Sequence, residues 1–426
     1  GIGLYKSSEM SITPSLAIGK TESTFNGSFR DDLKYTFNLG SVGIVMATSP
    51  VSRNQQSMWK NVQFGFGVNR MANFNNRIMI EGDNNESSLL FIYQDDARGD
   101  APDNLYINNR AFFEGLAYSA DLLFLPNAAD SASWNYRIDL PFAGVNQRKS
   151  IVTKGSLNEM VFTLGANYGD KLYLGATIGV PYIRYSESSI YTETDDADTI
   201  NYFHSFTRTD NLETSGTGIN FKFGLIYRAT DFLRIGGAIH TPTFYTGMAD
   251  SWNASIKSNF DDGNSYTARS PEGFYEYELT TPMRAIGSLG FIIGKAGLVS
   301  ADYEYVDYAS ARLRATDFDF IVENEAIRDN YLVAHNLRFG TEWRYGSLNF
   351  RGGYNISANP YRYGTDATNS SFSLGLGIRE KNFFIDMAWV HSNMDDEYHL
   401  YSSDYVAPAM TKVINDSFLM TIGIKY

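Results

Sequence analysis

The last ten residues of the chain, 417–426, alternate between apolar side chains and side chains that are mostly small or polar. Successive side chains of a β-strand point to opposite sides, so this segment predicts a strand with one apolar face and one more polar face. The pattern recurs along the chain, although a soluble antiparallel strand would show it too. The apolar set in this segment is Phe418, Met420, Ile422, Ile424 and Tyr426.

Fourteen segments of this kind can be recognised, and each is an expected strand. Most have at least the ~9–11 residues that a tilted strand needs to cross a bilayer. The predicted strands cover 10–19, 33–47, 60–71, 157–168, 171–184, 216–228, 232–240, 281–293, 297–306, 335–345, 347–356, 370–379, 382–391 and 415–426.

The connections between these strands fall into two sets that alternate along the chain. One set consists of tight turns built from turn-forming residues, at 169–170, 229–231, 294–296, 346 and 380–381. The other set is long, at 72–156, 185–215, 241–280, 307–334, 357–369 and 392–414. Short turns at one end, long loops at the other and an even strand number are typical of outer-membrane barrels. The sequence therefore predicts an all-β fold, a single 14-stranded antiparallel transmembrane β-barrel over residues 1–426, integral to a bacterial outer membrane.

The C-terminal strand also resembles the closing-strand signal of bacterial outer-membrane barrels, in which a terminal aromatic follows alternating apolar residues. In this interpretation Phe418, Met420, Ile422, Ile424 and Tyr426 form an assembly signal for the barrel-assembly machinery.

Several charged residues alternate with the apolar positions of the predicted strands. An arginine facing lipid at the bilayer midplane costs about 2–4 kcal/mol, so these charges are expected to face the lumen. Two interpretations remain open: a lattice of ion pairs that holds the wall rigid, or a polar path for the head group of a ligand. The predicted lumenal residues are Asp302, Glu304, Arg338, Glu342, Arg344, Arg351 and Asp386.

The long connection 72–156 differs from the others because it contains helical patterns. Asn85 to Ser88 followed by apolar residues predicts a capped helix start, and apolar spacings of three and four residues from Arg110 predict an amphipathic helix that ends at Pro126. The apolar face either packs within the loop and caps the barrel, or forms a gate or capture groove for an apolar ligand. The candidate ligand-binding residues are Leu89, Phe91, Phe112, Phe113, Leu116, Leu123 and Phe124.

Composition excludes several other functions. The chain has 426 residues, no cysteine and a formal net charge of −13, which argues against thiolate metal sites and nucleic-acid partners. Neither a phosphate-binding loop nor a GxSxG or HExxH motif is present, so neither an enzyme nor a cofactor is predicted. The acidic loop residues Asp195, Asp196 and Asp198 could hold a hard cation, but such carboxylates are usually only solvated.

Five stretches resemble the FadL-type long-chain fatty-acid and hydrocarbon transporters, and specifically their Bacteroidota branch. They lie at 168–182, 234–242, 281–290, 300–308 and 351–360. The resemblance implies a 14-stranded barrel with extracellular ligand capture, a lumenal pocket and a lateral exit beside a kinked strand, here the strand with Gly65 and Gly67. It also implies an N-terminal hatch in the lumen, which is expected to be largely absent from a chain that begins at Gly1.

Two functions remain open at this point. The first is passive uptake of hydrophobic small molecules, with outer-membrane lipid and an apolar ligand as partners. The alternative is an accessory or structural barrel in a larger outer-membrane complex for secretion or outer-membrane assembly, with other outer-membrane proteins as partners.

Overall fold

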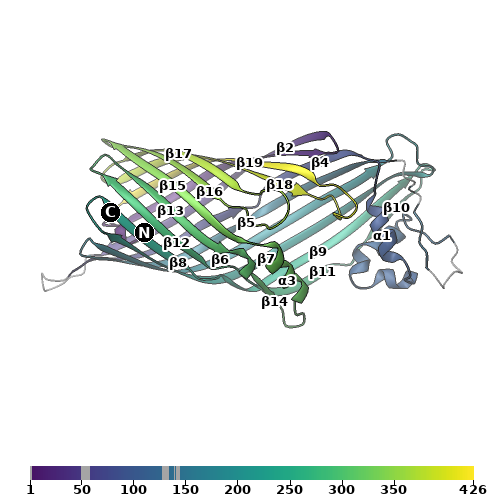
Figure 1. Ribbon diagram of the computed structural model, residues 1–426, viewed down its shortest axis with the longest axis horizontal. Helices are drawn as coiled ribbons and strands as arrows, with labels where there is room; N and C mark the ends of the chain where they lie inside the picture. Colours follow the sequence, from purple (N-terminus) through teal and green to yellow (C-terminus); the bar gives the residue numbers. More distant parts are fainter. Residues whose placement is uncertain (1, 49–57, 127–133, 139, 141–143) are drawn as a thin grey trace.

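The computed structural model describes residues 2–48, 58–126, 134–138, 140 and 144–426. It is a closed antiparallel β-barrel of 14 wall positions, elongated along its axis (Figure 1), so the predicted fold class is confirmed. The strands are β1 (Glu9–Phe25), β2 (Ser28–Thr48), β3 (Trp59–Asn73), β4 (Asn76–Asn84), β5 (Val145–Tyr168), β6 (Leu172–Thr194), β7 (Phe203–Arg228), β8 (Leu233–His240), β9 (Phe244–Phe260), β10 (Ser265–Arg269), β11 (Gly273–Thr280), β12 (Arg284–Ile293), β13 (Gly297–Asp307), β14 (Arg312–Arg314), β15 (Val333–Tyr345), β16 (Leu348–Ser357), β17 (Asn369–Arg379), β18 (Phe383–Tyr398) and β19 (Ala409–Lys425).

The barrel closes where the first and last strands pair. β1 pairs with β19 on one side, with Met10 opposite Ile424 and Leu16 opposite Phe418, and with β2 on the other. Four wall positions are each shared by two consecutive strands, namely β3 with β4, β8 with β9, β12 with β11, and β13 with β14. β10 extends β9 as a hairpin beyond the wall.

Two of the shared positions are interrupted at the same level by a proline. The breaks contain Pro242, between β8 and β9, and Pro282, between β11 and β12. Proline lacks a backbone N–H and cannot donate to the sheet. Thr243 and Thr281 bridge the two breaks, because the Thr243 N–H donates to the Thr281 hydroxyl at 3.0 Å and the Thr281 N–H donates to the Thr243 carbonyl at 3.0 Å. The wall therefore bends here without opening.

The wall position shared by β3 and β4 is broken differently. β3 pairs with β2 only opposite residues 41–48 of β2, and the register of β3 on β5 shifts between Arg70 and Ala72. β4 pairs with β5 and packs against the inner face of β1, where the Thr21 hydroxyl donates to Asn76 Oδ1 at 3.1 Å. Residues 28–40 of β2 pair with β1 on one edge, and among the described residues no strand hydrogen-bonds to their other edge. This break is called the β2–β4 step below.

Strands on the extracellular side extend further than predicted. β6 runs to Thr194, β7 begins at Phe203, and β9 occupies much of the predicted loop 241–280. The insertion predicted at 72–156 is shorter, 85–144, because β4 and the first half of β5 belong to the wall. These extensions carry polar residues on both faces, so they lack the apolar alternation that marks a membrane strand.

The helices are short. They are η1 (Ile2–Leu4), α1 (Leu89–Ala97), η2 (Pro102–Tyr106), η3 (Asn108–Phe112), α2 (Glu114–Ser119), η4 (Tyr308–Ser310) and α3 (Ile321–Asn330). The predicted helix start at Leu89 is confirmed, with Ser88 as N-cap. The single helix predicted from Arg110 is wrong, because Phe113 has φ −128° and ψ −97° and separates η3 from α2. None of the helices in the described residues has the length and apolarity to cross a membrane.

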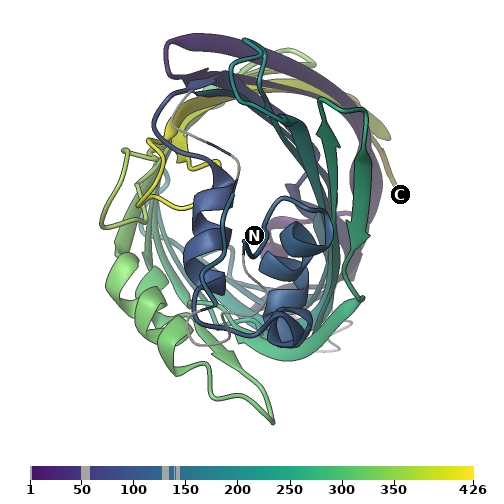
Figure 2. The same cartoon turned by 90° about the vertical axis from the view of Figure 1, so that its right-hand side faces the viewer.

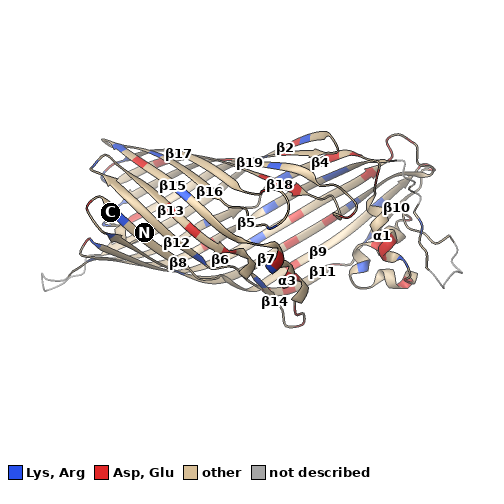
Figure 3. Cartoon of the chain, viewed as in Figure 1, with Lys and Arg blue, Asp and Glu red and all other residues tan. Residues whose placement is uncertain are grey.

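The outer face carries a belt of large apolar side chains. Phe339 is 48% exposed, Phe350 49% and Phe383 44%. Charged residues also occur within the strands (Figure 3). Strand register places those that alternate with this belt, such as Glu342 and Arg351, on the opposite, lumenal face. A continuous apolar belt of this kind belongs in hydrocarbon rather than in water.

Candidate ligand site at the barrel mouth

The helical insertion lies across the extracellular opening of the barrel, as Figure 2 shows for α1 and the short helices that follow. It has its own apolar core, in which Leu90, Leu105, Leu116 and Leu123 are 2%, 0%, 2% and 1% exposed. The insertion is thus a folded unit seated on the wall, and the question is what holds it there.

The anchor is Glu193, a fully buried carboxylate near the end of β6. It accepts hydrogen bonds from the Leu89 N–H at 2.9 Å, the Ser88 hydroxyl at 2.5 Å, Gln147 Nε2 at 3.1 Å and the Tyr191 hydroxyl at 2.5 Å. A carboxylate at a helix N-terminus also interacts favourably with the helix dipole. Burial raises the pKa of Glu193, while the four donors oppose that shift.

The last extracellular loop is tied to the same network. The Tyr401 hydroxyl contacts the Ser87 hydroxyl at 2.8 Å and accepts from Gln147 Nε2 at 2.9 Å. The insertion, β5, β6 and the 399–406 loop therefore meet at one buried polar cluster.

A cavity of about 470 Å³ lies between the insertion and the wall, next to this cluster. This volume is within the ~300–1,000 Å³ range typical of small-molecule sites. Its apolar lining comes from Leu89, Ile92, Phe113 and Leu400, and its polar lining from Tyr93, Asp96, Asn109, Arg110, Glu114, Lys149, Tyr191, Arg208, Asp210 and Tyr401. This cavity is called the mouth pocket below.

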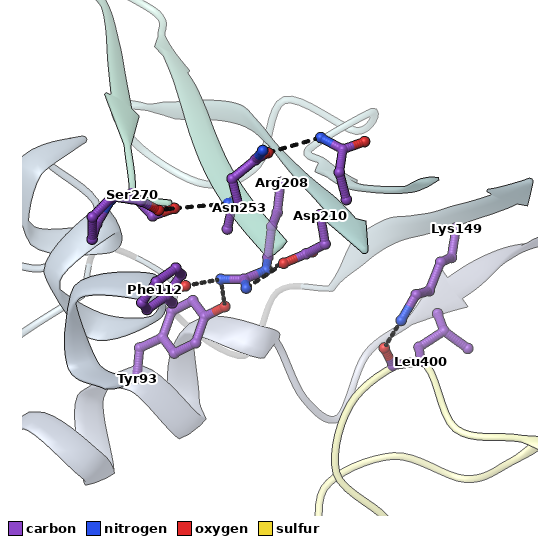
Figure 4. Close-up of polar contacts among 11 residues, drawn as sticks. Tyr93, Phe112, Lys149, Arg208, Asp210, Asn253, Ser270 and Leu400 are labelled. Atoms are coloured by element: carbon purple, nitrogen blue, oxygen red, sulfur yellow. Dashed lines mark hydrogen bonds and ion pairs between the residues drawn. The ribbon is translucent and has the colours of Figure 1, made fainter. Parts of the chain in front are cut away.

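Arg208 makes more hydrogen bonds than the other two cations of the mouth pocket, Arg110 and Lys149 (Figure 4). Its guanidinium donates to the Tyr93 hydroxyl at 2.8 Å, the Phe112 carbonyl at 2.9 Å and both oxygens of Asp210, at 2.8 and 2.5 Å. It also lies 5.0 Å from the ring centre of Phe113. These contacts join β7 to the insertion and fix the Phe113 ring at the pocket wall.

Lys149 also lines the mouth pocket, and its charge is less well compensated than that of Arg208. Its ammonium donates to the Leu400 carbonyl at 2.7 Å and lies 5.0 Å from the Tyr398 ring centre (Figure 4). No carboxylate within the described part of the chain forms an ion pair with it. Burial lowers the pKa of Lys149 to about 8. The pocket thus presents a desolvated cation without a paired anion.

The depressed pKa of Lys149 predicts a pH dependence for the docked 399–406 loop. The pKa of Lys149 is about 8 when the loop is docked and is expected to return to the ordinary value of 10.5 when it is undocked. Between these two values Lys149 binds more protons in the undocked state, so docking strengthens as pH rises through that window. Amide hydrogen exchange of residues 399–406, corrected for intrinsic rates, should slow by roughly tenfold to a hundredfold from pH 7 to pH 10. Lys149→Met should remove this dependence, whereas Lys412→Met, at an exposed lysine, should keep it. A slope that survives in Lys149→Met would contradict the assignment.

The structure separates the residues proposed from the sequence as ligand contacts. Leu89 and Phe113 line the mouth pocket, and Phe113 is 46% exposed. Leu116, Leu123 and Phe112 are buried, and Phe112 packs against Trp252. Phe91 is half-buried against the insertion core, and Phe124 forms a backbone bridge with Arg137.

The predicted lumenal charges form two groups. Glu342 pairs with Arg344 and Arg351, and Arg351 also pairs with Asp386 at 2.7 Å. Glu304 pairs with Arg338 at 3.1 Å, while Asp302 lies opposite Arg338 in the sheet. Asp302 lines a lumenal cavity of about 640 Å³.

Sequence reasoning missed other members of the lumen. Lys222 pairs with the buried carboxylate of Glu159, and both Lys222 and His240 lie at the lumenal cavity or its edge. The cavity is also lined by Ile2 to Leu4, whose segment is held by Gln63 Nε2 donating to the Tyr5 carbonyl at 2.8 Å. Glu159 and Lys222 lie within the predicted strands 157–168 and 216–228, so the alternation of inward and outward positions in these strands would have indicated both.

The remaining predicted sites are readily placed. Phe418, Ile422, Ile424 and Tyr426 are exposed on the outer face of the closing strand, with Met420 between them. No cluster of three metal-ligating side chains occurs among the residues described. Asp195 accepts from its own loop, at the Ile200 N–H.

Neither protein-family models nor curated proteins give a match to this chain. Solved structures do match over essentially its whole length. They include the Ralstonia pickettii toluene transporter TbuX (13% identity, 100% of this chain and 91% of that one, TM-score 0.50). The P. putida toluene transporter TodX has 10% identity, the same coverage of 100% and 91%, and a TM-score of 0.54. A Pseudomonas aeruginosa FadL homologue has 10% identity, coverage of 99% and 91%, and a TM-score of 0.55.

The fold is that of the FadL-type outer-membrane transport barrels. The resemblance expected from the sequence is thereby confirmed at the level of the fold, together with an integral outer-membrane architecture. The Bacteroidota branch stays a prediction.

Proposed function

We propose that this protein takes up hydrophobic small molecules, of the long-chain fatty-acid or hydrocarbon class, passively across the outer membrane. The observation that carries the proposal is the mouth pocket, a cavity in which four apolar side chains and three tyrosines lie beside several charged residues. Apolar surface of this kind gains about 25 cal/mol per Å² when an apolar chain covers it.

The proposed transport route has three parts. A ligand enters the mouth pocket, moves to the lumenal cavity of about 640 Å³ and leaves sideways at the β2–β4 step. Two outward aromatic residues of β2 support an exit at the β2–β4 step, since Tyr35 and Phe37 are 66% and 77% exposed beside it. Lys149 offers the mouth pocket a charge for an acidic head group, and the lumenal ion pairs continue a polar path.

A double substitution tests the mouth pocket. Ile92→Ser with Phe113→Ser removes two apolar side chains of the pocket and leaves the fully buried residues of the insertion core unchanged, and capture should weaken roughly tenfold. Initial uptake of a labelled long-chain fatty acid and of toluene, each at limiting concentration in cells, measures this loss.

Phe318→Ser is the matched control, because Phe318 is 51% exposed and lies outside the pocket. It should leave uptake unchanged, and both proteins should be present at wild-type abundance. Wild-type uptake by the double variant would contradict the proposal and favour the accessory-subunit alternative.

A further inference from the structure

Three neighbouring cations on the outer face of the barrel have no partner among the described residues. They are Arg70 on β3, Lys154 on β5 and Arg184 on β6, here called the outer cationic cluster. Within the described part of the chain, none of them makes a hydrogen bond or ion pair. The absence is informative in a chain with 48 acidic and 35 basic residues, where acids are abundant.

Strand register places all three side chains on the outside. Lys154 shares the face of β5 that carries Phe162 and Leu164, which are 50% and 53% exposed. Arg184 lies opposite Ser156, two residues from Lys154 on that same face. Arg70 shares the outward face of β3 with Phe66, and lies opposite Asn158, which is itself opposite Tyr182.

The cluster sits where the apolar belt ends. Arg70 follows Phe66 by four residues, and Tyr182 beside it is the kind of side chain that occupies the boundary between hydrocarbon and head groups. Arg70 Nε is buried and has no hydrogen-bond partner. A buried guanidinium N–H without an acceptor costs about 1–3 kcal/mol or more. The terminal nitrogens of Arg70 are not buried and make no hydrogen bond to the described residues, so they are open to a group outside this chain.

The surroundings extend the positive character toward the β2–β4 step. Lys34 reaches across the step to the Thr153 carbonyl at 3.1 Å and lies within electrostatic range of Lys154 and Arg77. Lys154 and Arg184 line a hollow of about 430 Å³. Two acids, Glu213 and Asp250, also line this hollow, but among the described residues neither forms an ion pair with Lys154 or Arg184.

We propose that the outer cationic cluster binds the phosphorylated head group of an outer-leaflet lipid. Arginine binds phosphate bidentately, and cations at the membrane boundary select anionic head groups. The acyl chains of the same lipid would cover the belt below, where Phe66 and Phe162 pack together at 5.1 Å. The inference concerns a different face from the mouth pocket and does not depend on what the barrel transports.

Native mass spectrometry of the purified protein in detergent tests the proposal, with bisphosphorylated lipid A as the probe. Wild-type protein should retain the lipid, and Arg70→Gln with Lys154→Gln and Arg184→Gln should lower its apparent affinity at least about tenfold, since each charge-assisted contact is strong. Lys20→Gln with Lys412→Gln is the matched control, because Lys20 is paired with Glu22 at 2.6 Å and Lys412 lies opposite Glu22 and Asp395. This control should bind as wild type does.

A second comparison keeps the test decisive if the triple variant folds poorly. The charge-retaining variant Arg70→Lys with Arg184→Lys should bind lipid A measurably better than Arg70→Gln with Arg184→Gln. Equal retention of lipid A by wild type, by the triple glutamine variant and by the glutamine pair at Arg70 and Arg184 would overturn the proposal. Equal binding of the dephosphorylated lipid would also overturn it. Displacement of lipid A by inorganic phosphate or palmitate at matched concentration would assign the cluster to a free anion or to a fatty acid, which would likewise overturn it.

Discussion

Arginine in place of Phe350 is expected to leave most of the protein uninserted in cells. Phe350 is on the outer belt, opposite Trp343 on β15 and Leu376 on β17, and is 49% exposed. An arginine facing lipid costs up to about 4 kcal/mol, depending on its depth in the bilayer, and this is a large share of the stability of a typical domain. The heat-modifiable fraction on a detergent gel of the membrane fraction measures the loss, because a closed barrel migrates differently before and after boiling.

Ser373→Arg provides the matched comparison. Ser373 lies on β17 between the outward residues Phe372 and Leu374, so an arginine there enters the lumen, next to Gly353 of β16. This variant should insert nearly as well as wild type. Similar losses in both variants would mean that the facing of these strands is misassigned by one residue.

Glu193→Leu is expected to release α1 from the wall while leaving the barrel closed. The substitution removes the acceptor of four buried donors, at Leu89, Ser88, Gln147 and Tyr191. Leaving buried partners unpaired costs on the order of 3–5 kcal/mol, which corresponds to a roughly hundredfold to thousandfold loss of local protection. Hydrogen exchange of residues 89–97 reports this loss directly.

Asp196→Leu, three residues further along and exposed, serves as the control and should leave the exchange of α1 unchanged. Uptake by Glu193→Leu should fall as well, because the mouth pocket loses one wall. Native protection of α1 in Glu193→Leu would show that the apolar core of the insertion, rather than the carboxylate, holds α1 in place.

The membrane-spanning half of the fold could be predicted from the sequence because lipid imposes a period of two on one face. Phe418 to Tyr426 and Phe350 to Tyr354 show it plainly. The same rule fails beyond the bilayer, where β6 continues through Glu187 to Glu193 with polar or aromatic residues facing inward. No apolar period marks such a segment, so it was expected to be a loop.

The candidate site could be predicted only in outline. Phe113 and Leu116 satisfy the same helical spacing, yet Phe113 is 46% exposed at the pocket and Leu116 is 2% exposed in the core of the insertion. Periodicity cannot distinguish them, because the backbone turns at Phe113. Lys149 and Glu193 lie beyond the ends of the strands predicted at 157–168 and 171–184. They could have been indicated only by assuming that the alternation of inward and outward positions continues past those ends.

The β2–β4 step also has a consequence for the membrane around the protein. Residues 28–40 of β2 present one edge of backbone N–H and C=O groups without a strand partner among the described residues. Hydrocarbon cannot satisfy such groups, so water or polar head groups have to reach them. The bilayer should therefore be thinner and wetter along this flank than around the rest of the circumference, and a lipid crossing between leaflets would meet its lowest barrier there.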